Sequence, residues 1–362
     1  MKTRSRVAIV APSLRYVGGQ SAQANLLLRQ WKDDPDVEVR FIAADPDFPR
    51  SLAWAGRIPY FRTVARTPFY LAALWRGLKD ADIAHIFSAS YWSFLLAPSP
   101  ALLVAKLRGA KTVMNYHSGE ARDHLSRWRT ALPILRRFDR IVTPSNYLVD
   151  VFREFGLHAQ AVPNVIDENQ FHYRLRRPLQ PRLICTRGFG AYYSVDHVVR
   201  AFAQVEREFP EASLTLAGTG PEEPVIRRLV QELKLSRVEF LGAVPYDKMG
   251  ACYDRADIFV NASWLDNMPL SILEAFSSGT PVVTTAPEGI RYLVRHEYSG
   301  LLCEPADFES LARNVIRLLN DPDLALRLSQ NAFRESQKYQ WPAVRSQWLS
   351  VYRDLLNRSN PL

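Results

Sequence analysis

The chain has 362 residues, of which 47% are hydrophobic and 23% charged, which excludes global disorder and leaves room for two folded domains. Its three cysteines lie far apart without a CxxC pair, so a disulfide framework and a thiolate zinc site are excluded and a reducing compartment is favoured. The formal net charge is +9, and no apolar run reaches the roughly 18 residues of a membrane span or the length of a signal peptide, so we expect a cytoplasmic protein.

Short β-branched runs alternate with amphipathic, helix-length segments through the first half of the chain. Helices are expected over 20–31 and 145–155, the second with Ser145 as its N-cap and Gly156 as its stop. Apolar strands separated by helices predict a mostly parallel sheet covered on both faces. The expected strands are residues 7–12, 37–43, 83–87, 111–116, 140–143 and 160–163.

The excess positive charge lies in the first half. Residues 1–175 hold 24 basic and 15 acidic side chains, whereas residues 176–362 hold 22 of each. The stretch 48–79 carries six basic residues, no acid and six aromatic residues between them. This pattern suits an anionic membrane surface. The alternatives are a solvated helix with a buried aromatic face and, with no accompanying signature, nucleic acid, which we do not expect as a partner.

Three loops of the first half carry polar or flexible residues. Gly18 and Gly19 follow the first strand and precede a helix, where they allow the backbone to approach a ligand or simply form a turn. Asp45-Pro46-Asp47 has the form of a metal-binding DxD motif, but its prolines favour a turn. His117 closes a strand and begins a polar cluster whose spacing matches no common metal motif. The other members of that cluster are Glu120, Asp123 and His124.

A polar, proline-bearing stretch at 167–181 separates two predicted domains, 1–166 and 182–340. The tail from 308 to 356 is almost entirely helical in pattern, and we expect a final helix, 341–357, to pack back on the first domain. Two doubly wound, Rossmann-like domains facing a central cleft are the predicted architecture. The expected strands of the second half are residues 182–186, 213–217, 238–241, 258–261, 281–285 and 301–303.

Two glycine motifs of the second half fall short of a dinucleotide fingerprint. Gly218-Thr219-Gly220 has Glu223 where a third glycine would stand, and Gly188-Phe189-Gly190 has Tyr193 there. A nicotinamide site is therefore weakly supported.

The most specific segment runs from Asn261 to Thr285. A strand leads to a loop with Asp266, Pro269 stands near a helix start, and Glu274 follows inside the helix. The helix start offers free N–H groups to a phosphate or sugar oxygen, and the two acids can accept hydrogen bonds from hydroxyl groups. The alternative interpretation makes Asp266 an ordinary helix-start acid and Glu274 a surface residue.

At this segment the chain resembles the retaining glycosyltransferases of family 4, which have the two-lobed GT-B fold. Their Glu-x7-Glu motif appears here as Asp266-x7-Glu274, followed by Gly279-Thr280-Pro281-Val282-Val283. The resemblance covers most of the chain. Further similar segments are the Gly18-Gly19 loop, Tyr116-His117-Ser118, Pro144-Ser145-Asn146-Tyr147, Val162-Pro163-Asn164-Val165-Ile166-Asp167, Tyr298-Ser299-Gly300-Leu301-Leu302 and Tyr339-x-Trp341.

The resemblance implies metal-independent transfer of a sugar from a UDP- or GDP-linked donor to a glycan or lipid-linked acceptor, with no cofactor and with retention. It places the donor on the second domain and implies a role in cell-surface polysaccharide or glycolipid synthesis, peripheral to the inner face of the membrane. Arg187, Asp266, Glu274 and His117 are the implied catalytic residues. Those expected to bind the donor are Gly18, Gly19, Gly218, Asn267, Met268, Pro269 and Leu270, and the candidates on the acceptor side are Arg15 and Glu120.

The chain departs from the family pattern at the donor diphosphate. The family places a lysine a few residues after the arginine, whereas this chain has Tyr192-Tyr193-Ser194, so that Arg15 is a candidate for the missing cation. Two alternatives therefore stay open. One is a GT-B sugar-nucleotide epimerase, and the other is a catalytically inactive partner subunit.

Overall fold

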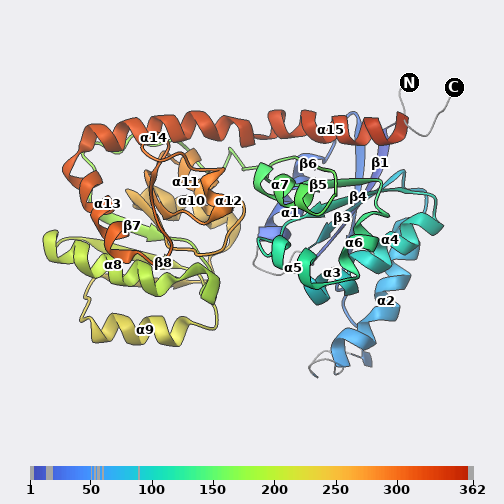
Figure 1. Cartoon of the computed structure of the whole chain (residues 1–362), viewed down its shortest axis with the longest axis horizontal. Helices are drawn as coiled ribbons and strands as arrows, with labels where there is room; N and C mark the ends of the chain where they lie inside the picture. Colours follow the sequence, from blue (N-terminus) through green and yellow to red (C-terminus); the bar gives the residue numbers. More distant parts are fainter. Residues whose placement is uncertain are drawn as a thin grey trace. The chain divides into compact units, whose positions relative to one another are not determined.

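The computed structural model describes residues 4–13, 19–49, 51–52, 54, 58, 61–88 and 90–357 (Figure 1). The chain forms two compact units. Unit 1 comprises residues 1–165 and 344–362, and unit 2 comprises residues 166–343. Each unit holds one parallel six-stranded sheet, which confirms the predicted α/β class.

The sheet of unit 1 has the order β2-β1-β3-β4-β5-β6. The chain leaves β1 toward β2 on one side and continues from β3 on the other, so the carboxyl ends of β1 and β3 form a topological switch point, where such sheets bind ligands. The strands are β1 (Ser5–Ala11), β2 (Val37–Ala43), β3 (Ile83–Ser88), β4 (Lys111–Tyr116), β5 (Arg140–Thr143) and β6 (Ala159–Ala161).

Helices cover both faces of this sheet. Ala84 and Ile86 of β3 belong to the same core cluster as residues of α2 and α4. His85, on the opposite face of the same strand, contacts Trp348 and Tyr352 of α15. The last helix is thus part of unit 1 from Val344 onward. The helices are α1 (Gly19–Gln30), α2 (Phe61–Gly77), α3 (Tyr91–Leu96), α4 (Pro98–Leu107), α5 (Ala121–Arg127), α6 (Ala131–Leu135), α7 (Asn146–Glu154) and α15 (Trp341–Asn357).

The sheet of unit 2 has the order β12-β11-β10-β7-β8-β9, and its switch point lies between β7 and β10. The strands are β7 (Arg182–Cys185), β8 (Ser213–Ala217), β9 (Val238–Gly242), β10 (Ile258–Asn261), β11 (Val282–Thr285) and β12 (Leu301–Cys303). The helices are α8 (Val195–Glu208), α9 (Glu223–Glu232), α10 (Tyr246–Arg255), α11 (Leu270–Ser277), α12 (Glu288–Arg291), α13 (Phe308–Asn320) and α14 (Pro322–Ser336), with short 3-10 turns η2 (Ala191–Tyr193) and η3 (Gln337–Tyr339).

The segment 167–181 packs along unit 2. Arg176 in this segment is buried and donates hydrogen bonds to the carbonyl oxygens of Tyr253 (2.8 Å) and Ala256 (2.8 Å). These bonds satisfy the guanidinium inside the unit and fix the path of the segment.

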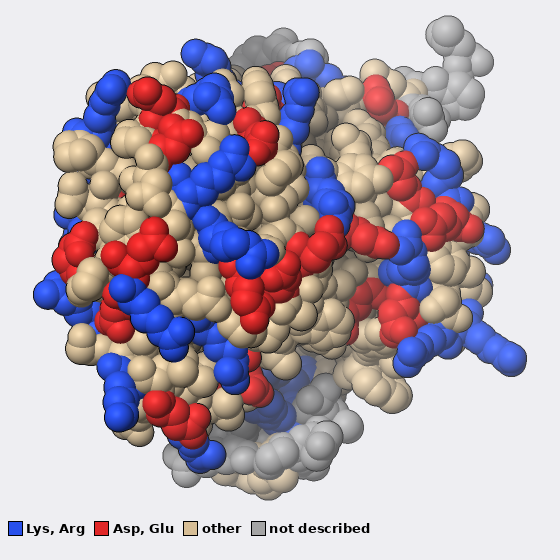
Figure 2. Space-filling model, turned by 60° about the vertical axis from the view of Figure 1, so that its left-hand side comes forward, with Lys and Arg blue, Asp and Glu red and all other residues tan. Residues whose placement is uncertain are grey.

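Two surface properties bear on the expected partners. No helix among the described residues is both long enough and apolar enough to cross a bilayer. Basic and acidic side chains are interspersed on the face of the molecule in Figure 2, so that face carries no extended region of one sign.

Candidate active site

Three loops of unit 2 meet at the switch point, beyond the carboxyl ends of β7, β8 and β10. The loops after β7 and β8 lie against each other, because the N–H of Phe189 donates to the carbonyl of Thr219 at 2.9 Å. A Cβ on Gly218 would lie 2.2 Å from the carbonyl oxygen of Arg187, so only glycine permits this approach. Gly218 therefore fixes the backbone of Arg187.

Arg187 is buried at this junction. Its Nη2 forms an ion pair with Oδ2 of Asp266, its Nη1 donates to Oγ of Ser271 at 3.0 Å, and its guanidinium lies 4.2 Å from the ring centre of Tyr193. Burial is the largest effect and disfavours the charged guanidinium, but the Asp266 carboxylate, together with smaller contributions from Tyr193, Cys185 and Tyr253, holds the pKa of Arg187 above its usual value. The site thus retains a permanent, partly desolvated cation.

Glu274 lies on the buried side of α11, which begins after Pro269. Its Oε2 accepts a hydrogen bond from Oη of Tyr253 at 3.0 Å, and burial raises the pKa of Glu274 to about 7. The side chain is only 5% exposed. The interpretation of Glu274 as a surface residue is wrong.

The loop between Asp266 and α11 is held rigidly. The N–H of Asn267 donates to Oδ1 of Asp266 at 2.9 Å, and Asn267 and Met268 are buried. A Cβ on Gly289 would lie 2.4 Å from the carbonyl oxygen of Asp266, so the loop packs directly on α12. The loop leads through Pro269 to Leu270, where the first turn of α11 presents backbone N–H groups suited to an anion.

The structure thus brings Arg187 and Asp266 into contact and adds residues that the sequence did not indicate. Ser271 lies within the Asp266-x7-Glu274 spacing, so the spacing itself could have indicated it. Tyr253 comes from α10 and carried no such signal, and Tyr193 was noted only as a departure from a dinucleotide fingerprint and from the family pattern.

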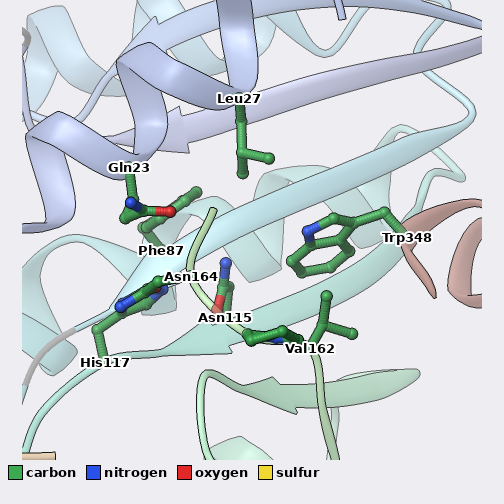
Figure 3. A pocket seen from close by; sticks show the side chains of 9 residues that line it. Gln23, Leu27, Phe87, Asn115, His117, Val162, Asn164 and Trp348 are labelled. Atoms are coloured by element: carbon green, nitrogen blue, oxygen red, sulfur yellow. The ribbon is translucent and has the colours of Figure 1, made fainter. Parts of the chain in front are cut away.

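The first-unit candidates lie on separate elements. His117 follows β4, where its N–H donates to the carbonyl of Ser88 at 3.0 Å and its ring stacks on Phe87 with centres 5.1 Å apart (Figure 3). Burial lowers the pKa of His117 to about 3, so the imidazole is neutral. Glu120 precedes α5, and its N–H donates to Oγ of Ser118 at 3.2 Å. Gly19 begins α1, whereas Arg15 and Gly18 lie outside the described residues.

No group of three or more His, Cys, Asp or Glu side chains suited to a metal ion occurs in the described part of the chain. His124 and Asp123 instead hydrogen-bond to Tyr116 (2.9 Å) and Tyr91. Asp45 accepts a hydrogen bond from the N–H of Ser13 at 2.7 Å, which links the segments that follow β1 and β2.

Two family models together cover residues 17–335. The model described as "Glycosyltransferase Family 4" matches residues 17–170, and the one described as "Glycosyl transferases group 1" matches residues 169–335. The second contains Arg187, Asp266 and Glu274.

Similar proteins include both curated relatives and solved structures. An exopolysaccharide phosphotransferase of Streptomyces coelicolor is 29% identical over 79% of this chain and 31% of its own length. The N-acetyl-alpha-D-glucosaminyl L-malate synthase of Bacillus anthracis is 32% identical over 54% of each chain. The chain thus spans about a third of the length of the first relative and about half of the length of the second. The structure of Anabaena HepE in complex with UDP and glucose is 18% identical with a TM-score of 0.76, and the match covers 97% of this chain and 100% of that one.

Proposed function

We propose that this chain, a member of the group 1 glycosyl transferases of glycosyltransferase family 4, transfers a sugar from a nucleoside diphosphate to a hydroxyl group of a glycan or lipid-linked acceptor. In the proposed reaction the bond between the sugar's anomeric carbon and the diphosphate oxygen breaks. A bond to the acceptor oxygen forms on the same face of the sugar, and the acceptor proton passes to the departing phosphate. The products are a glycoside of retained configuration and a nucleoside diphosphate.

The observation that carries this proposal is the buried Arg187 beside the N-terminus of α11. A departing diphosphate gains negative charge, and a preorganised guanidinium with helix N–H groups stabilises it in a water-poor site. Each such charged hydrogen bond contributes about 1.5–3 kcal/mol. Asp266 is the proposed partner of the sugar hydroxyls, together with the backbone of 267–270, and Glu274 the partner of the ribose hydroxyls.

A UDP-linked donor is the first choice to test, because HepE is seen with UDP and the Bacillus anthracis relative is named an N-acetyl-alpha-D-glucosaminyl L-malate synthase. The phosphotransferase named above is matched over 31% of its length, and both family models that match this chain are those of glycosyltransferases. Glycosyl transfer is therefore favoured over phosphoryl transfer.

A panel of sugar nucleotides screened by thermal shift tests the donor, since a ligand bound only by the folded state raises Tm. Product analysis with the donor alone separates the alternatives. An epimerase would release an epimerised sugar or sugar nucleotide without an acceptor, and an inactive partner subunit would leave the donor intact in every mixture. Glycoside formed only with an added acceptor supports the proposal.

Removal of divalent ions is expected to leave turnover unchanged, because Arg187 and the α11 amides supply the positive potential at the diphosphate. Turnover measured with excess EDTA checks this. Adding Mg²⁺ or Mn²⁺ back is the control. A loss of turnover in EDTA that Mn²⁺ restores would contradict the metal-free proposal.

His117→Ala is expected to lower donor turnover about tenfold, because a hydrogen bond to a sugar hydroxyl is lost. The ratio of wild-type to variant turnover is expected to stay constant between about pH 5 and 9. The pKa of His117 is about 3, so its ring stays neutral throughout this range. Measured pH–rate profiles of both proteins check this. A ratio that changes around the ordinary histidine pKa would mean that the ring titrates in the site.

We propose further that unit 1 docks on an anionic membrane. Nine of the fourteen exposed large hydrophobic side chains in the described residues lie between positions 52 and 107. Arg108 places the end of α4 against α2, with its guanidinium 3.7 Å from the ring centre of Trp75. The exposed large hydrophobic side chains of these helices, here called the α2–α4 surface, are Leu71, Trp75, Leu103 and Leu107. Exposed basic residues of the same helices, Arg76 and Lys106, suit anionic lipid.

The double variant Leu103→Asp/Leu107→Asp is expected to lose at least about tenfold in vesicle binding, because two exposed leucines can no longer insert. Co-sedimentation with phosphatidylglycerol-containing vesicles measures it, and vesicles of phosphatidylcholine alone test the charge requirement. Val225→Asp, at an exposed apolar position of α9 in unit 2, is the matched control. Failure of wild-type protein to co-sediment with anionic vesicles would favour a soluble acceptor and a solvated surface.

A further inference from the structure

A small polar cavity lies inside unit 1, between the sheet and α15 (Figure 3). Asn115 and His117 line it from β4 and the residue after it, and Trp348 of α15 lies across the cavity from His117. Its volume is about 10 Å³, which is room for one water molecule. The cavity adjoins the carboxyl ends of β3 and β4.

A chain of hydrogen bonds runs from α15 to this cavity. Oη of Tyr352 lies 2.8 Å from Nδ1 of His85, and Nε2 of His85 lies 2.9 Å from Nδ2 of Asn115. The amide nitrogen of Asn115 can only donate, so Nε2 of His85 accepts and the ring proton sits on Nδ1, from which it is donated to Tyr352. Burial lowers the pKa of His85 to about 3, which agrees with this neutral form.

Ring stacking follows the same route. His85 lies 4.4 Å from Trp348 and 5.2 Å from Phe87, and Phe87 lies 5.1 Å from His117, measured between ring centres. The rings of His85 and Phe87, and of Phe87 and His117, are nearly parallel, at 9° and 18°. The His117 ring is therefore held on one face by Phe87.

Two side chains that line the cavity each hold a buried polar atom without a partner among the described residues. These atoms are Oδ1 of Asn115 and Nε2 of His117. Buried polar atoms of this kind are normally satisfied by protein or by ordered water. The cavity has the size and the polar lining for one such water.

We propose that an ordered water in this cavity joins Nε2 of His117 to Oδ1 of Asn115, which makes Asn115, His85 and Tyr352 positioning residues for His117. Oδ1 can only accept, so the water donates to it and accepts the proton of His117 Nε2. Nδ1 of His117 is then left as an acceptor for a hydroxyl group. The inference rests on the proposed role of His117 at the transferred sugar. The hydrogen-bond chain through Tyr352 links α15 to the proposed contact between His117 and the sugar.

The test combines side-chain NMR with a double-mutant cycle. In wild-type protein labelled with ¹⁵N-histidine, long-range ¹H–¹⁵N spectra are expected to show His117 in the Nε2–H form and His85 in the Nδ1–H form. Asn115→Leu should give a mixture of His117 tautomers and lower UDP-sugar turnover roughly tenfold. The same substitution should change turnover less than about twofold when made in His117→Ala. Tyr352→Phe should give a smaller loss, and Tyr70→Phe, which removes another buried hydroxyl of unit 1, should give none.

The outcomes separate the inference from the proposed function. An Nδ1–H form of His117 in wild-type protein, or an equal effect of Asn115→Leu in both backgrounds, would overturn the inference. If His117→Ala leaves turnover unchanged, the sugar contact of the proposed function fails, while the NMR arm still decides whether the water link exists. Folding of each variant is checked by its Tm.

Discussion

Replacement of Arg187 by alanine is expected to lower donor turnover by at least about 100-fold, because the variant loses the buried cation at the departing diphosphate. The same change also leaves the carboxylate of Asp266 buried without its partner, which costs about 3–5 kcal/mol of folding free energy. Turnover and Tm must therefore be measured together. A loss of activity alone would not separate chemistry from folding.

A second substitution separates the two effects of the Arg187 change. Arg187→Ala/Asp266→Asn removes the uncompensated charge and is expected to recover most of the lost stability without recovering turnover. Arg182→Ala, which breaks another ion pair of unit 2 at Asp257, is the matched control and is expected to lower Tm without a specific loss of turnover. Full turnover in folded Arg187→Ala would mean that the diphosphate binds elsewhere.

Glu274→Gln is expected to abolish nucleotide binding and yet to stabilise the fold at neutral and alkaline pH. The buried carboxyl has a folded-state pKa of about 7, above the ordinary value of 4.5, so the folded state binds a proton more tightly than the unfolded one. Wild-type stability therefore falls as the pH rises from 4.5 to 7 and then levels off. The total change is on the order of 3 kcal/mol, and the glutamine variant lacks it.

Thermal unfolding between about pH 5 and 9 measures the difference in stability between wild-type protein and Glu274→Gln. The Tm of Glu274→Gln is expected to exceed that of wild-type protein above pH 7 and to approach it toward pH 5, as the folded-state pKa of about 7 requires. Glu309→Gln, an exposed position at the start of α13, should change neither Tm nor nucleotide affinity. A variant that binds UDP and GDP as tightly as wild-type protein would exclude the proposed ribose contact.

Most strands and helix ends could be predicted because their signals are local. The strands expected at 37–43, 111–116 and 213–217 have those bounds in the structure, since β-branched residues between helical patterns depend little on distant contacts. Ser145 caps α7 by accepting from the N–H of Leu148 at 3.3 Å, and Gly156 follows with φ of 66°.

What could not be predicted depends on packing between distant parts of the chain. Arg187 and Asp266 are separated by 79 positions, and nothing in either segment indicates that the two side chains form an ion pair. Tyr253 reaches Glu274 only because α10 packs beside α11. His85 stands in a strand that reads as apolar, and its partner Tyr352 lies 267 positions away.

Exposure was the other property that the sequence left open. Helix α4 is apolar on nearly every side, a pattern typical of a buried helix. In the structure, Leu103 and Leu107 are 60% and 66% exposed. The sequence therefore indicated the basic and aromatic stretch at 48–79 but not the part that α4 contributes to the α2–α4 surface.

Calorimetric titration of UDP, UMP and uridine in EDTA tests the central claim, that unit 2 binds a diphosphate through Arg187 without a divalent ion. If UDP is not bound, the guanine series replaces it. Wild-type protein is expected to bind the diphosphate at least about tenfold more tightly than the monophosphate, and folded Arg187→Ala/Asp266→Asn to lose that difference. Equal affinity for diphosphate and monophosphate in wild-type protein, or an unchanged difference in the variant, would contradict it.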